Sequence, residues 1–406
     1  MIHVCFSLHD KTGRYSKFTG TTILSVFENT NSDVTAHILH DNTLTQENRD
    51  KFIYLAGRYG QVVKFYNVEE LCAEKISEMI KLIPAAKTSR LSVAALYRLL
   101  IPQLLPADID KCIYLDSDIA VNLDINELWQ INLGDKPLAA ADEMRIDNLF
   151  YPITFVRNYL ITEGFVDYHD YFNSGVLLTN LKILRGEEET IMHGVKFVGE
   201  HPQLLHLDQE VLNYLYSKNY LKLDEKFNSF VRKSRHHPEK INRKIYHFAG
   251  AELKIDITDL FNRLWMHYFI KSPWFDENTI GRLYSNFQQV HIELKNSMIK
   301  LSAAMSGKTR AFITVERELR KLVETFSVRN DEEIIIVADS IHVNKIIEKI
   351  YSSHDEKIFF ILLPNFPLTV LTEEGLVQGK DFFNAYDFLL KAQDISRNSR
   401  KFIETM

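Results

Sequence analysis

Apolar positions in the first part of the chain follow two periods in turn. Runs of strand length alternate with stretches that have the helical spacing of apolar residues. The strand-like runs are 2–8, 34–40, 61–66 and 111–115, and the helical stretches between them are 17–29, 45–59 and 90–105. Strands alternating with helices are typical of a mostly parallel sheet covered by helices. The pattern predicts an α/β, Rossmann-like unit. Further strands are predicted at 137–141 and 174–180, and a further helix at 207–217.

The pattern changes beyond about residue 260. Residues 260–300 look helical and rich in aromatic residues, with a break at Pro273. These aromatic side chains could stack on sugars, although packing between helices is their commoner use. They are Trp265, Tyr268, Phe269, Trp274, Phe275 and Tyr284. The last part of the chain predicts a small α/β addition, with strands at 333–338 and 358–363, a helix at 342–352 between them and a closing helix at 384–395.

Composition narrows the class of protein. A chain of 406 residues is longer than one hydrophobic core usually organises, and 46% hydrophobic with 25% charged residues is ordinary for a globular protein. A net charge of −6 gives no reason to expect nucleic acid as a partner. Cys5, Cys72 and Cys112 lack metal-ligand spacing and suit reduced thiols. With no apolar run of roughly 18 residues, we expect no transmembrane segment and a cytoplasmic or at most peripheral protein.

The strongest candidate for chemistry is Asp116-Ser117-Asp118, directly after the apolar run 113–115. Two carboxylates at the end of a strand can converge on one divalent cation, and such a cation would most naturally hold a diphosphate. Ligands of open α/β sheets bind at the carboxyl ends of strands. An acidic pair that only caps a strand in a solvated loop is the alternative interpretation.

Other phosphate-handling motifs fit less well. In a phosphatase of the haloacid-dehalogenase type, Thr or Val follows the Asp pair where this chain has Ala120. The segment 306–309 has the tail of a P-loop, but Ser302 stands where the first glycine belongs. Residues 6–10 carry no Gly-x-Gly-x-x-Gly, which argues against a dinucleotide oxidoreductase.

Several ordered motifs surround the Asp pair. They are Tyr97-Arg98-Leu99, Ile113 to Asp118, Leu128-Trp129, Leu133-Gly134-Asp135, Ala139 to Asp142, Tyr171 to Leu178, Leu207-Asp208-Gln209 with Leu212-Asn213, and Tyr246 to Gly250. In order and approximate spacing, this set resembles the family 8 retaining glycosyltransferases over residues 1 to about 255. The resemblance implies a GT-A, Rossmann-like mixed sheet flanked by helices. It also implies a catalytic domain at 1–258, followed by the helical segment 259–300 and the addition at 301–406.

The resemblance further implies a metal-dependent hexosyltransferase that uses UDP-galactose or UDP-glucose as donor and forms an alpha linkage. Asp116, Asp118 and His247 would hold the metal, and one imidazole beside two carboxylates favours Mn²⁺ over Mg²⁺. Residues of the donor-sugar pocket carry over as Arg98, Asp116, Asp142, Asn173, Asp208 and Gln209, so Asp116 would contact both the metal and the donor. Gln209 would lie on the β face of the anomeric carbon. Front-face transfer with retention is favoured and a double displacement stays open.

Some of these residues have simpler interpretations. Arg98 could be a cation on a helix surface, Asp208 could be only a helix N-cap, and His247 could be a satisfied core histidine.

The nucleotide side departs from the family pattern. The residues expected to contact the nucleotide or its diphosphate, besides Arg98 and Asp116, are Ser7, Asp10, Tyr15, Ser117, Gly250 and Lys254. His9 stands where an acid is expected, and Glu252-Leu253-Lys254-Ile255 replaces the usual Lys-Pro-Trp after the histidine motif, with Lys254 as the candidate diphosphate partner. Tyr15 could stack on the base, and Asp10 could accept a hydrogen bond from the N–H of the uracil. The basic stretch 232–237 is either a solvated loop or a contact with the phosphates or the acceptor.

The acceptor is expected to be a saccharide on a protein or lipid carrier, in bacterial surface-glycan or adhesin glycosylation. The addition at 301–406 would serve acceptor binding or oligomerisation. A catalytically silent partner of another glycosyltransferase, which binds sugar nucleotides or glycans, is the alternative function.

Overall fold

A computed structural model gives the arrangement of most of the chain. It describes residues 1–13, 15–87, 93–143, 152–166, 170–204, 206–231, 240–250, 253, 259–278, 280, 281, 285, 292, 296, 308–316, 319, 322, 332–337, 343–353, 356–363, 366 and 368–385. The chain divides into two compact units, Met1–Thr279 and a second within Ile280–Phe402. The helical segment predicted at 259–300 falls across this division.

The first unit is built on a mixed sheet. Its described strands have the order β3-β2-β1-β4-β7-β6-β8. Neighbours from β3 to β4 run parallel, β7 is antiparallel to both β4 and β6, and β8 is parallel to β6. The strands are β1 (Ile2–Leu8), β2 (Val34–His40), β3 (Val62–Asn67), β4 (Lys111–Leu115), β6 (Leu138–Asp142), β7 (Phe172–Asn180) and β8 (Leu221–Lys222). The predicted strands and the mixed α/β class are confirmed, and the continuous run of parallel neighbours from β3 ends at β4.

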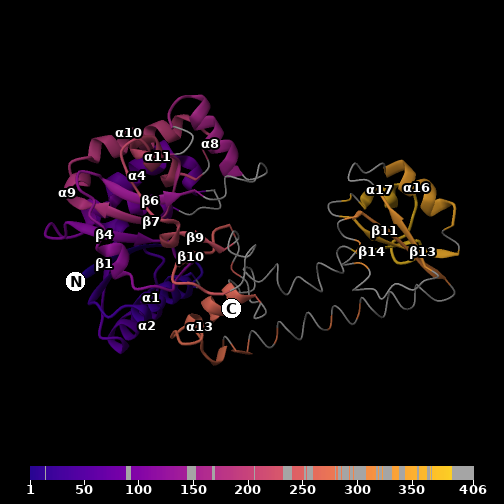
Figure 1. The fold of residues 1–406 in the computed structure, drawn as a ribbon, viewed down its shortest axis with the longest axis horizontal. Helices are drawn as coiled ribbons and strands as arrows, with labels where there is room; N and C mark the ends of the chain where they lie inside the picture. The colour runs from indigo at the N-terminus through magenta and orange to yellow at the C-terminus, as the bar shows by residue number, and fades with distance from the viewer. Residues whose placement is uncertain are drawn as a thin grey trace. The chain divides into compact units, whose positions relative to one another are not determined.

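Helices surround this sheet. In Figure 1, α4, α10 and α11 lie around β6 and β7, whereas α1 and α2 lie near β1. The longer described helices of this unit are α1 (Ser16–Asn29), α2 (Gln46–Arg58), α4 (Ala73–Leu82), α8 (Pro152–Thr162), α10 (Glu188–Glu200), α11 (Asp208–Tyr216) and α13 (Leu260–Phe269). The short ones are α3 (Val68–Leu71), η1 (Pro84–Lys87), α7 (Asn126–Trp129), α9 (Leu181–Leu184) and η4 (Glu225–Phe227). The pattern of apolar residues did not predict α4, α8 or α10.

The helix predicted at 90–105 is broken into short pieces. The described part runs through α5 (Ala94–Tyr97), the 3₁₀ turn η2 (Arg98–Leu100) and α6 (Ile101–Leu104), and residues 88–92 lie outside the described part. Pro102 at the start of α6 has no N–H to continue the hydrogen bonds of a preceding α-helix. The break places Arg98 in the tight turn.

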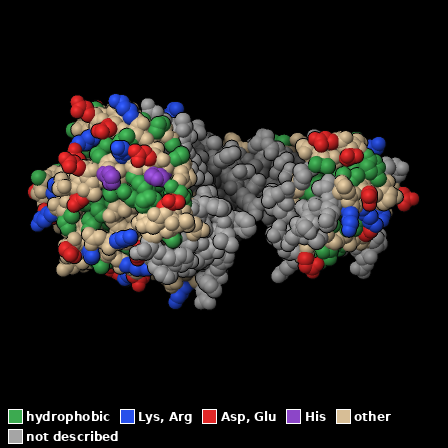
Figure 2. All heavy atoms as spheres, turned by 90° about the horizontal axis from the view of Figure 1, so that it is seen from above, with side chains coloured by type: hydrophobic (Ala, Val, Ile, Leu, Met, Phe, Trp, Pro, Cys, Tyr) green, Lys and Arg blue, Asp and Glu red, His purple; other side chains and the backbone are tan. Residues whose placement is uncertain are grey.

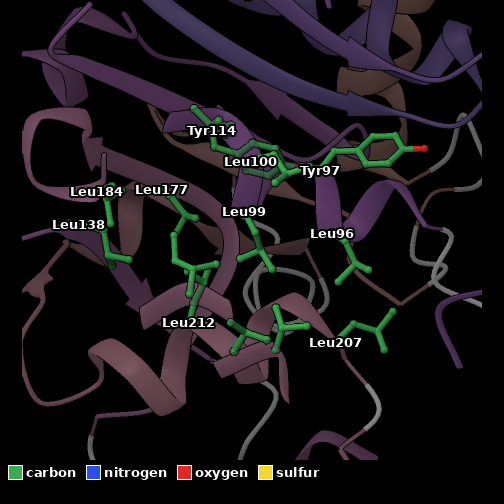
Figure 3. Close-up of a cluster of buried hydrophobic side chains, with 14 of the residues drawn as sticks. Leu96, Tyr97, Leu99, Leu100, Tyr114, Leu138, Leu177, Leu184, Leu207 and Leu212 are labelled. Carbon is green, nitrogen blue, oxygen red and sulfur yellow. The ribbon is translucent and has the colours of Figure 1, made fainter. Parts of the chain in front are cut away.

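A continuous apolar core lies between these pieces and the sheet. Leu99 and Leu100 pack with Leu177 of β7 and Leu212 of α11, and all four are at most 6% exposed. Figure 3 shows these side chains with Tyr97 and Tyr114 in the same cluster. The core holds the carboxyl end of β4 and the start of α11 in fixed positions.

A second, smaller sheet extends the carboxyl end of β4. It contains β5 (Ile119–Val121), β10 (Ile245–His247) and β9 (Ser229–Phe230). β10 is antiparallel to β5, with His247 opposite Ile119, and parallel to β9. This pairing brings a residue from the end of the family-like region beside the Asp pair.

The aromatic segment after residue 258 packs into the first unit. Trp265, Tyr268 and Phe269 of α13 are at most 2% exposed, and Trp274 is 6% exposed. A Cβ added at Gly20 of α1 would lie 2.0 Å from the Trp274 ring, so the two elements meet at a position without a side chain. Core packing, the commoner use of such residues, is confirmed for these four, while Tyr284 lies outside the described residues.

The second unit has its own parallel sheet of order β12-β11-β13-β14. The strands are β11 (Thr309–Thr314), β12 (Glu333–Ile336), β13 (Lys357–Leu362) and β14 (Phe382–Asn384), with α16 (Val343–Tyr351) and α17 (Thr369–Glu373). Both predicted strands and the helix between them are confirmed, while β11 and β14 were not predicted. The closing helix predicted at 384–395 lies outside the described residues from 386 onward.

On the face shown in Figure 2, acidic and basic side chains of the first unit are interspersed. None of the helices in the described ranges combines the length and the apolar character that crossing a bilayer requires.

Candidate functional site

Asp116, Asp118 and His247 form one cluster at the carboxyl end of β4. The strand ends at Leu115, β5 begins at Ile119, and β10 places His247 opposite Ile119. The His247 Nε2 atom lies 3.3 Å from Asp118 Oδ1 and 3.8 Å from Asp116 Oδ2. One ligand atom from each of the three residues lies within 4.8 Å of the others, which is the spacing a shared cation requires.

Gly175 of β7 provides the space for this cluster. Its carbonyl accepts from the Asp116 N–H at 2.8 Å. A Cβ built on Gly175 would lie 2.4 Å from His247 Cε1 and 2.8 Å from Asp116 Oδ2. The residue next to the cluster must therefore be glycine. Two carboxylates and one imidazole around this space fit a divalent cation that accepts nitrogen as well as oxygen ligands.

Helix α1 holds the turn between the two aspartates. Thr19 Oγ1 lies 2.8 Å from Ser117 Oγ, and Thr22 Oγ1 donates to the Ser117 carbonyl at 2.9 Å and to the Ile119 carbonyl at 2.8 Å. Ser117 is 5% exposed. The Asp pair thus lies in a fixed turn. The contact of Ser117 with a diphosphate stays a prediction.

Arg98 is buried beside the cluster. Its Nη2 donates to Asp116 Oδ1 at 2.8 Å, its Nε lies 3.0 Å from Asp208 Oδ2, and its Nη1 donates to the Ser174 carbonyl at 2.7 Å. Burial by itself would lower the pKa of Arg98, but the carboxylates of Asp116 and Asp208 outweigh it and raise that pKa. The alternative of a surface cation does not hold, because the side chain is 8% exposed.

Asp116 therefore has two differently used oxygens. Oδ1 accepts from Arg98 and, at 3.0 Å, from the Tyr114 hydroxyl. Oδ2 is the oxygen that lies near His247. The same carboxylate joins the arginine pocket to the cluster of metal-ligand type.

Asp208 is the first residue of α11. The helix N-cap is Leu207, whose φ of 51° is unusual for a residue with a side chain, so Asp208 is not the cap. Ser174 Oγ donates to Asp208 Oδ2 at 3.0 Å. Burial raises the pKa of Asp208 to about 6, although Arg98 opposes the change.

Asn173 and Gln209 form a pair of buried amides next to Asp208. Asn173 Nδ2 donates to Gln209 Oε1 at 2.9 Å, and the Ser174 N–H donates to the same oxygen at 3.1 Å. Gln209 Nε2 donates to the Tyr171 hydroxyl at 3.0 Å. Four of the predicted pocket residues are thus brought together: Arg98, Asn173, Asp208 and Gln209.

Glu143 also belongs to this pocket and was missed in the sequence. Its Oε2 accepts from Asn173 Nδ2 at 2.9 Å and from Gln209 Nε2 at 3.3 Å, and the residue is fully buried. It directly follows the predicted strand 137–141 and Asp142, where side chains point toward ligands of α/β sheets. The predicted residue Asp142 instead pairs with Lys222 at 2.6 Å with 42% of its side chain exposed. Its role stays a prediction.

On the nucleotide side, Asp10 is 1% exposed and its carboxylate accepts from the Tyr15 N–H, the Ser16 hydroxyl and Asn48 Nδ2. Burial raises the pKa of Asp10 and these hydrogen bonds oppose the rise. The carboxylate orders the loop between β1 and α1. Contacts of Asp10 and of the half-buried Tyr15 with a base stay predictions, as does the role of the buried Ser7 at the end of β1.

His9, which stands in place of an expected acid, pairs with a carboxylate from β2's end. Its Nδ1 lies 2.5 Å from Asp41 Oδ2, which also accepts from the Tyr97 hydroxyl at 2.9 Å. Burial by itself raises the pKa of Asp41, but hydrogen bonds from His9, Thr43 and Tyr97 lower it to about 2. The hydrogen bond to Asp41 in turn raises the pKa of His9.

The remaining predicted residues lie at or beyond the edge of the described part. Gly250 follows β10 with a φ of 77°, a conformation that favours glycine. Lys254 and the basic stretch 232–237 lie outside the described residues.

A family model described as glycosyl transferase family 8 matches residues 7–254 of the chain. This chain belongs to glycosyl transferase family 8. The match covers the Asp pair, the arginine and amide pocket and His247, and it confirms the resemblance seen in the motifs.

Two bacterial relatives show what this family 8 chain is similar to. It is 27% identical over 214 residues to a lipopolysaccharide 1,3-galactosyltransferase of Salmonella typhimurium, which is 52% of this chain and 59% of that enzyme. It is 26% identical over 262 residues to a lipopolysaccharide 1,2-glucosyltransferase of Escherichia coli, which is 63% of this chain and 68% of that enzyme. The first match thus spans less than two thirds of the relative.

Among solved structures, the galactosyltransferase LgtC, crystallised with donor and acceptor sugar analogues, has a similar fold. The TM-score is 0.53 with 21% identity, and the match covers 69% of this chain and 99% of LgtC. The likeness confirms the GT-A fold expected from the family 8 resemblance.

Proposed function

We propose that this family 8 chain is a metal-dependent retaining glycosyltransferase that moves galactose or glucose from a UDP-sugar to a saccharide acceptor, with an alpha linkage. The observation that carries the proposal is the position of the Asp116, Asp118 and His247 cluster. It shares the Asp116 carboxylate with the buried Arg98 pocket. A metal site and a polar pocket joined by one carboxylate suit a donor whose diphosphate and sugar must be held at the same time.

The proposed cation is Mn²⁺, with Mg²⁺ second, because the site offers a nitrogen ligand. Asp116, Asp118 and His247 would hold it, and the three side chains are between 3% and 26% exposed. Bound there, it would supply Lewis-acid stabilisation for the negative charge of a diphosphate. Ser117, Gly250 and Lys254 are proposed to contact the same phosphates.

The buried polar residues would bind and orient the donor sugar. Ion pairs with Asp116 and Asp208 hold Arg98 in place in the protein without a ligand. Gln209 and Asn173 hold each other and are proposed to face the reacting carbon, with Asp142 on the sugar. Glu143 is the buried carboxylate a double displacement would need, but its Oε2 accepts from two amides, which lowers its nucleophilicity. We therefore favour front-face transfer.

The acceptor is proposed to be a saccharide on a lipid or protein carrier in bacterial surface-glycan or adhesin glycosylation. Two relatives carry names that place a galactosyl or glucosyl group on lipopolysaccharide, which supports this class. The second unit is proposed to contribute to acceptor binding or to oligomerisation. The cytoplasmic location expected from the sequence stays a prediction.

Release of UDP tests the proposal. Purified protein is incubated with UDP-galactose, UDP-glucose or UDP-N-acetylglucosamine and Mn²⁺, with and without a chelator. We expect UDP release with one of the two hexose donors and its loss with the chelator. If no donor is cleaved and the chelator changes nothing, the protein is the catalytically silent partner instead.

Asp118→Asn tests the metal assignment directly. An amide cannot supply the negative charge that a carboxylate ligand gives, so we expect metal-dependent UDP release to fall to background while the circular dichroism spectrum is unchanged. Asp33→Asn, an exposed aspartate before β2, is the matched control and should keep full activity. Retained activity in Asp118→Asn would remove this residue from the metal site.

A further inference from the structure

We propose that Asn228 is a positioning residue of the metal site. It would hold the His247 ring in the tautomer whose Nε2 presents its lone pair to the cation, and it is itself oriented by Asn173 of the donor pocket. The inference rests on the proposed metal dependence. Asn228 precedes β9, is fully buried, and belongs to none of the motifs in the sequence.

The orientation of Asn173 is fixed by the backbone. The Gly175 N–H lies 2.9 Å from Asn173 Oδ1, and because a backbone N–H can only donate, the atom it faces must be the oxygen. The other end of the amide, Nδ2, then faces Glu143 Oε2 and Gln209 Oε1. Both of these atoms are acceptors. Gln209 Oε1 is identified independently, because it accepts from the Ser174 N–H.

The orientation of Asn228 follows from that of Asn173. Asn228 Nδ2 donates to Asn173 Oδ1 at 2.8 Å. The remaining end of the Asn228 amide, Oδ1, therefore faces His247 Nδ1 at 2.9 Å. A carbonyl oxygen can only accept, so His247 Nδ1 must carry the hydrogen. The neutral ring then has its lone pair on Nε2, the atom that lies 3.3 Å from Asp118 Oδ1.

Packing keeps the ring in this position. Phe230 stacks on His247 with ring centroids 5.2 Å apart and an interplanar angle of 25°. Gly175 approaches the ring so closely that an added Cβ would lie 2.4 Å from Cε1. His247 is 3% exposed, so little water reaches it to replace the Asn228 oxygen. The tautomer thus follows from hydrogen bonds whose directions are fixed by the backbone N–H groups of Ser174 and Gly175.

Partners of this kind matter for metal binding. Metal-binding histidines usually donate their second ring N–H to a fixed acceptor, and loss of that acceptor typically costs about 10–100-fold in metal affinity. The usual acceptor is a carboxylate, a backbone carbonyl or water, whereas here it is a side-chain amide. Hydrogen bonds between the side-chain amides also link His247 to Asn173 and Gln209. Because Asn228 contacts His247 directly, a change at Asn228 should affect the metal site first.

Titration of chelator-treated protein with Mn²⁺, followed by electron paramagnetic resonance of the free ion, tests the role of Asn228. Asn228→Leu removes the acceptor at similar volume, and we expect about 10–100-fold weaker binding. Asn228→Asp keeps an acceptor for the Nδ1 hydrogen and should bind more tightly than Asn228→Leu. Asn262→Leu, which removes an equally buried amide from α13, is the control and should bind like the wild type.

The tautomer itself can be read without metal. Nitrogen NMR of protein labelled at histidine, with His247→Gln for assignment, should show the hydrogen on Nδ1 in the wild type. A wild type with the hydrogen on Nε2, or Asn228→Leu with wild-type Mn²⁺ affinity, would overturn the inference. If the wild type binds no Mn²⁺ but shows hydrogen on Nδ1, the proposed metal dependence fails while the orienting role of Asn228 stands.

Discussion

At the scale of single residues, carboxylates outnumber cations in the described part of the pocket. Asp116, Asp118, Asp208 and Glu143 lie around the single guanidinium of Arg98 and the ring of His247. Burying several carboxylates together disfavours their charged forms unless cations or hydrogen bonds compensate. A divalent cation would reduce this excess charge, which adds a physical reason for the proposed metal to those from the ligand types.

Gly175→Ala should damage the metal site without removing any ligand. The added Cβ would lie 2.4 Å from His247 Cε1, so the ring or strand β7 must move. Overpacking of this kind typically costs about 1–3 kcal/mol of folding free energy. We expect a small fall in the melting temperature and a large loss of Mn²⁺ affinity. Gly186→Ala, on the turn after α9, is the control. Mn²⁺ affinity equal to that of the wild type would contradict the close approach.

Asp208 should give the activity an acidic limb near pH 6. Burial raises the pKa of Asp208 to about 6, so the carboxylate that fixes Arg98 is lost as the pH falls through this value. We expect the kcat/KM for UDP release, measured at saturating Mn²⁺, to fall between pH 7 and pH 5. Asp208→Asn should show lower activity and no limb at this position.

Protonation of Asp208 cannot cause this loss of activity at acidic pH by unfolding the protein. Because the pKa of Asp208 is higher in the folded protein than its ordinary value of 3.8, the folded state binds the proton first, and this group stabilises the fold as the pH falls from 7 to 5. The melting temperature should therefore not follow the activity. An unchanged limb in Asp208→Asn would assign it to another group.

At the scale of elements, the aromatic segment supports the nucleotide side of the site from outside the matched region. Trp274 Nε1 donates to Asn48 Oδ1 at 2.8 Å, and Asn48 Nδ2 donates to Asp10 Oδ2 and to the Gly13 carbonyl, both at 2.9 Å. Through Asn48 of helix α2, Trp274 thus helps to hold the loop between β1 and α1 in place. The segment has a structural role that its aromatic composition does not reveal.

Trp274→Phe tests this connection. The ring packing is largely kept, but the buried Asn48 oxygen loses its donor, which typically costs about 1–3 kcal/mol. We expect a raised KM for the UDP-sugar with a smaller change in kcat, measured by initial rates. Trp265→Phe is the matched control, because Trp265 is also buried, at 0% exposed against 6% for Trp274, and its Nε1 has no hydrogen-bond partner among the described residues. Equal effects of the two variants on KM would show that only packing matters.

At the scale of the whole molecule, the residues of the site belong to one unit. The metal cluster, the arginine pocket and Trp274 all lie within Met1–Thr279. The second unit has its own parallel sheet with buried Phe312, Ile313, Phe359 and Phe360. Each unit therefore has a core of the kind that allows independent folding.

A chain cut after residue 279 should keep UDP release. Since the described site residues are all in the first unit, we expect donor cleavage by residues 1–279 close to that of the full chain. Transfer to an acceptor, measured with the same donor, should fall if the second unit contributes to acceptor binding. Circular dichroism controls for folding of the shortened chain. Loss of donor cleavage in a folded fragment would show that the second unit completes the site.

The sequence alone determined the local features of this protein. Apolar periodicity predicted β1, β2, β4 and α11 nearly to their ends, because the burial of one or both faces of an element determines which nearby positions are apolar. The family motifs identified the Asp pair and His247. The apolar pattern did not predict the break of the helix around Arg98, where Pro102 and the packing of three short pieces decide the conformation.

Only the tertiary structure decided which residues meet. Glu143 and Asn228 carry no motif, and they join the site because strand pairing and helix α11 bring distant segments together. The position of Trp274 depends likewise on the missing side chain at Gly20. Hydrogen-bond direction and buried charge depend on neighbours in space, and a linear pattern does not contain them. The cluster of Asp116, Asp118 and His247 is therefore visible in the sequence, whereas the amides that orient it are not.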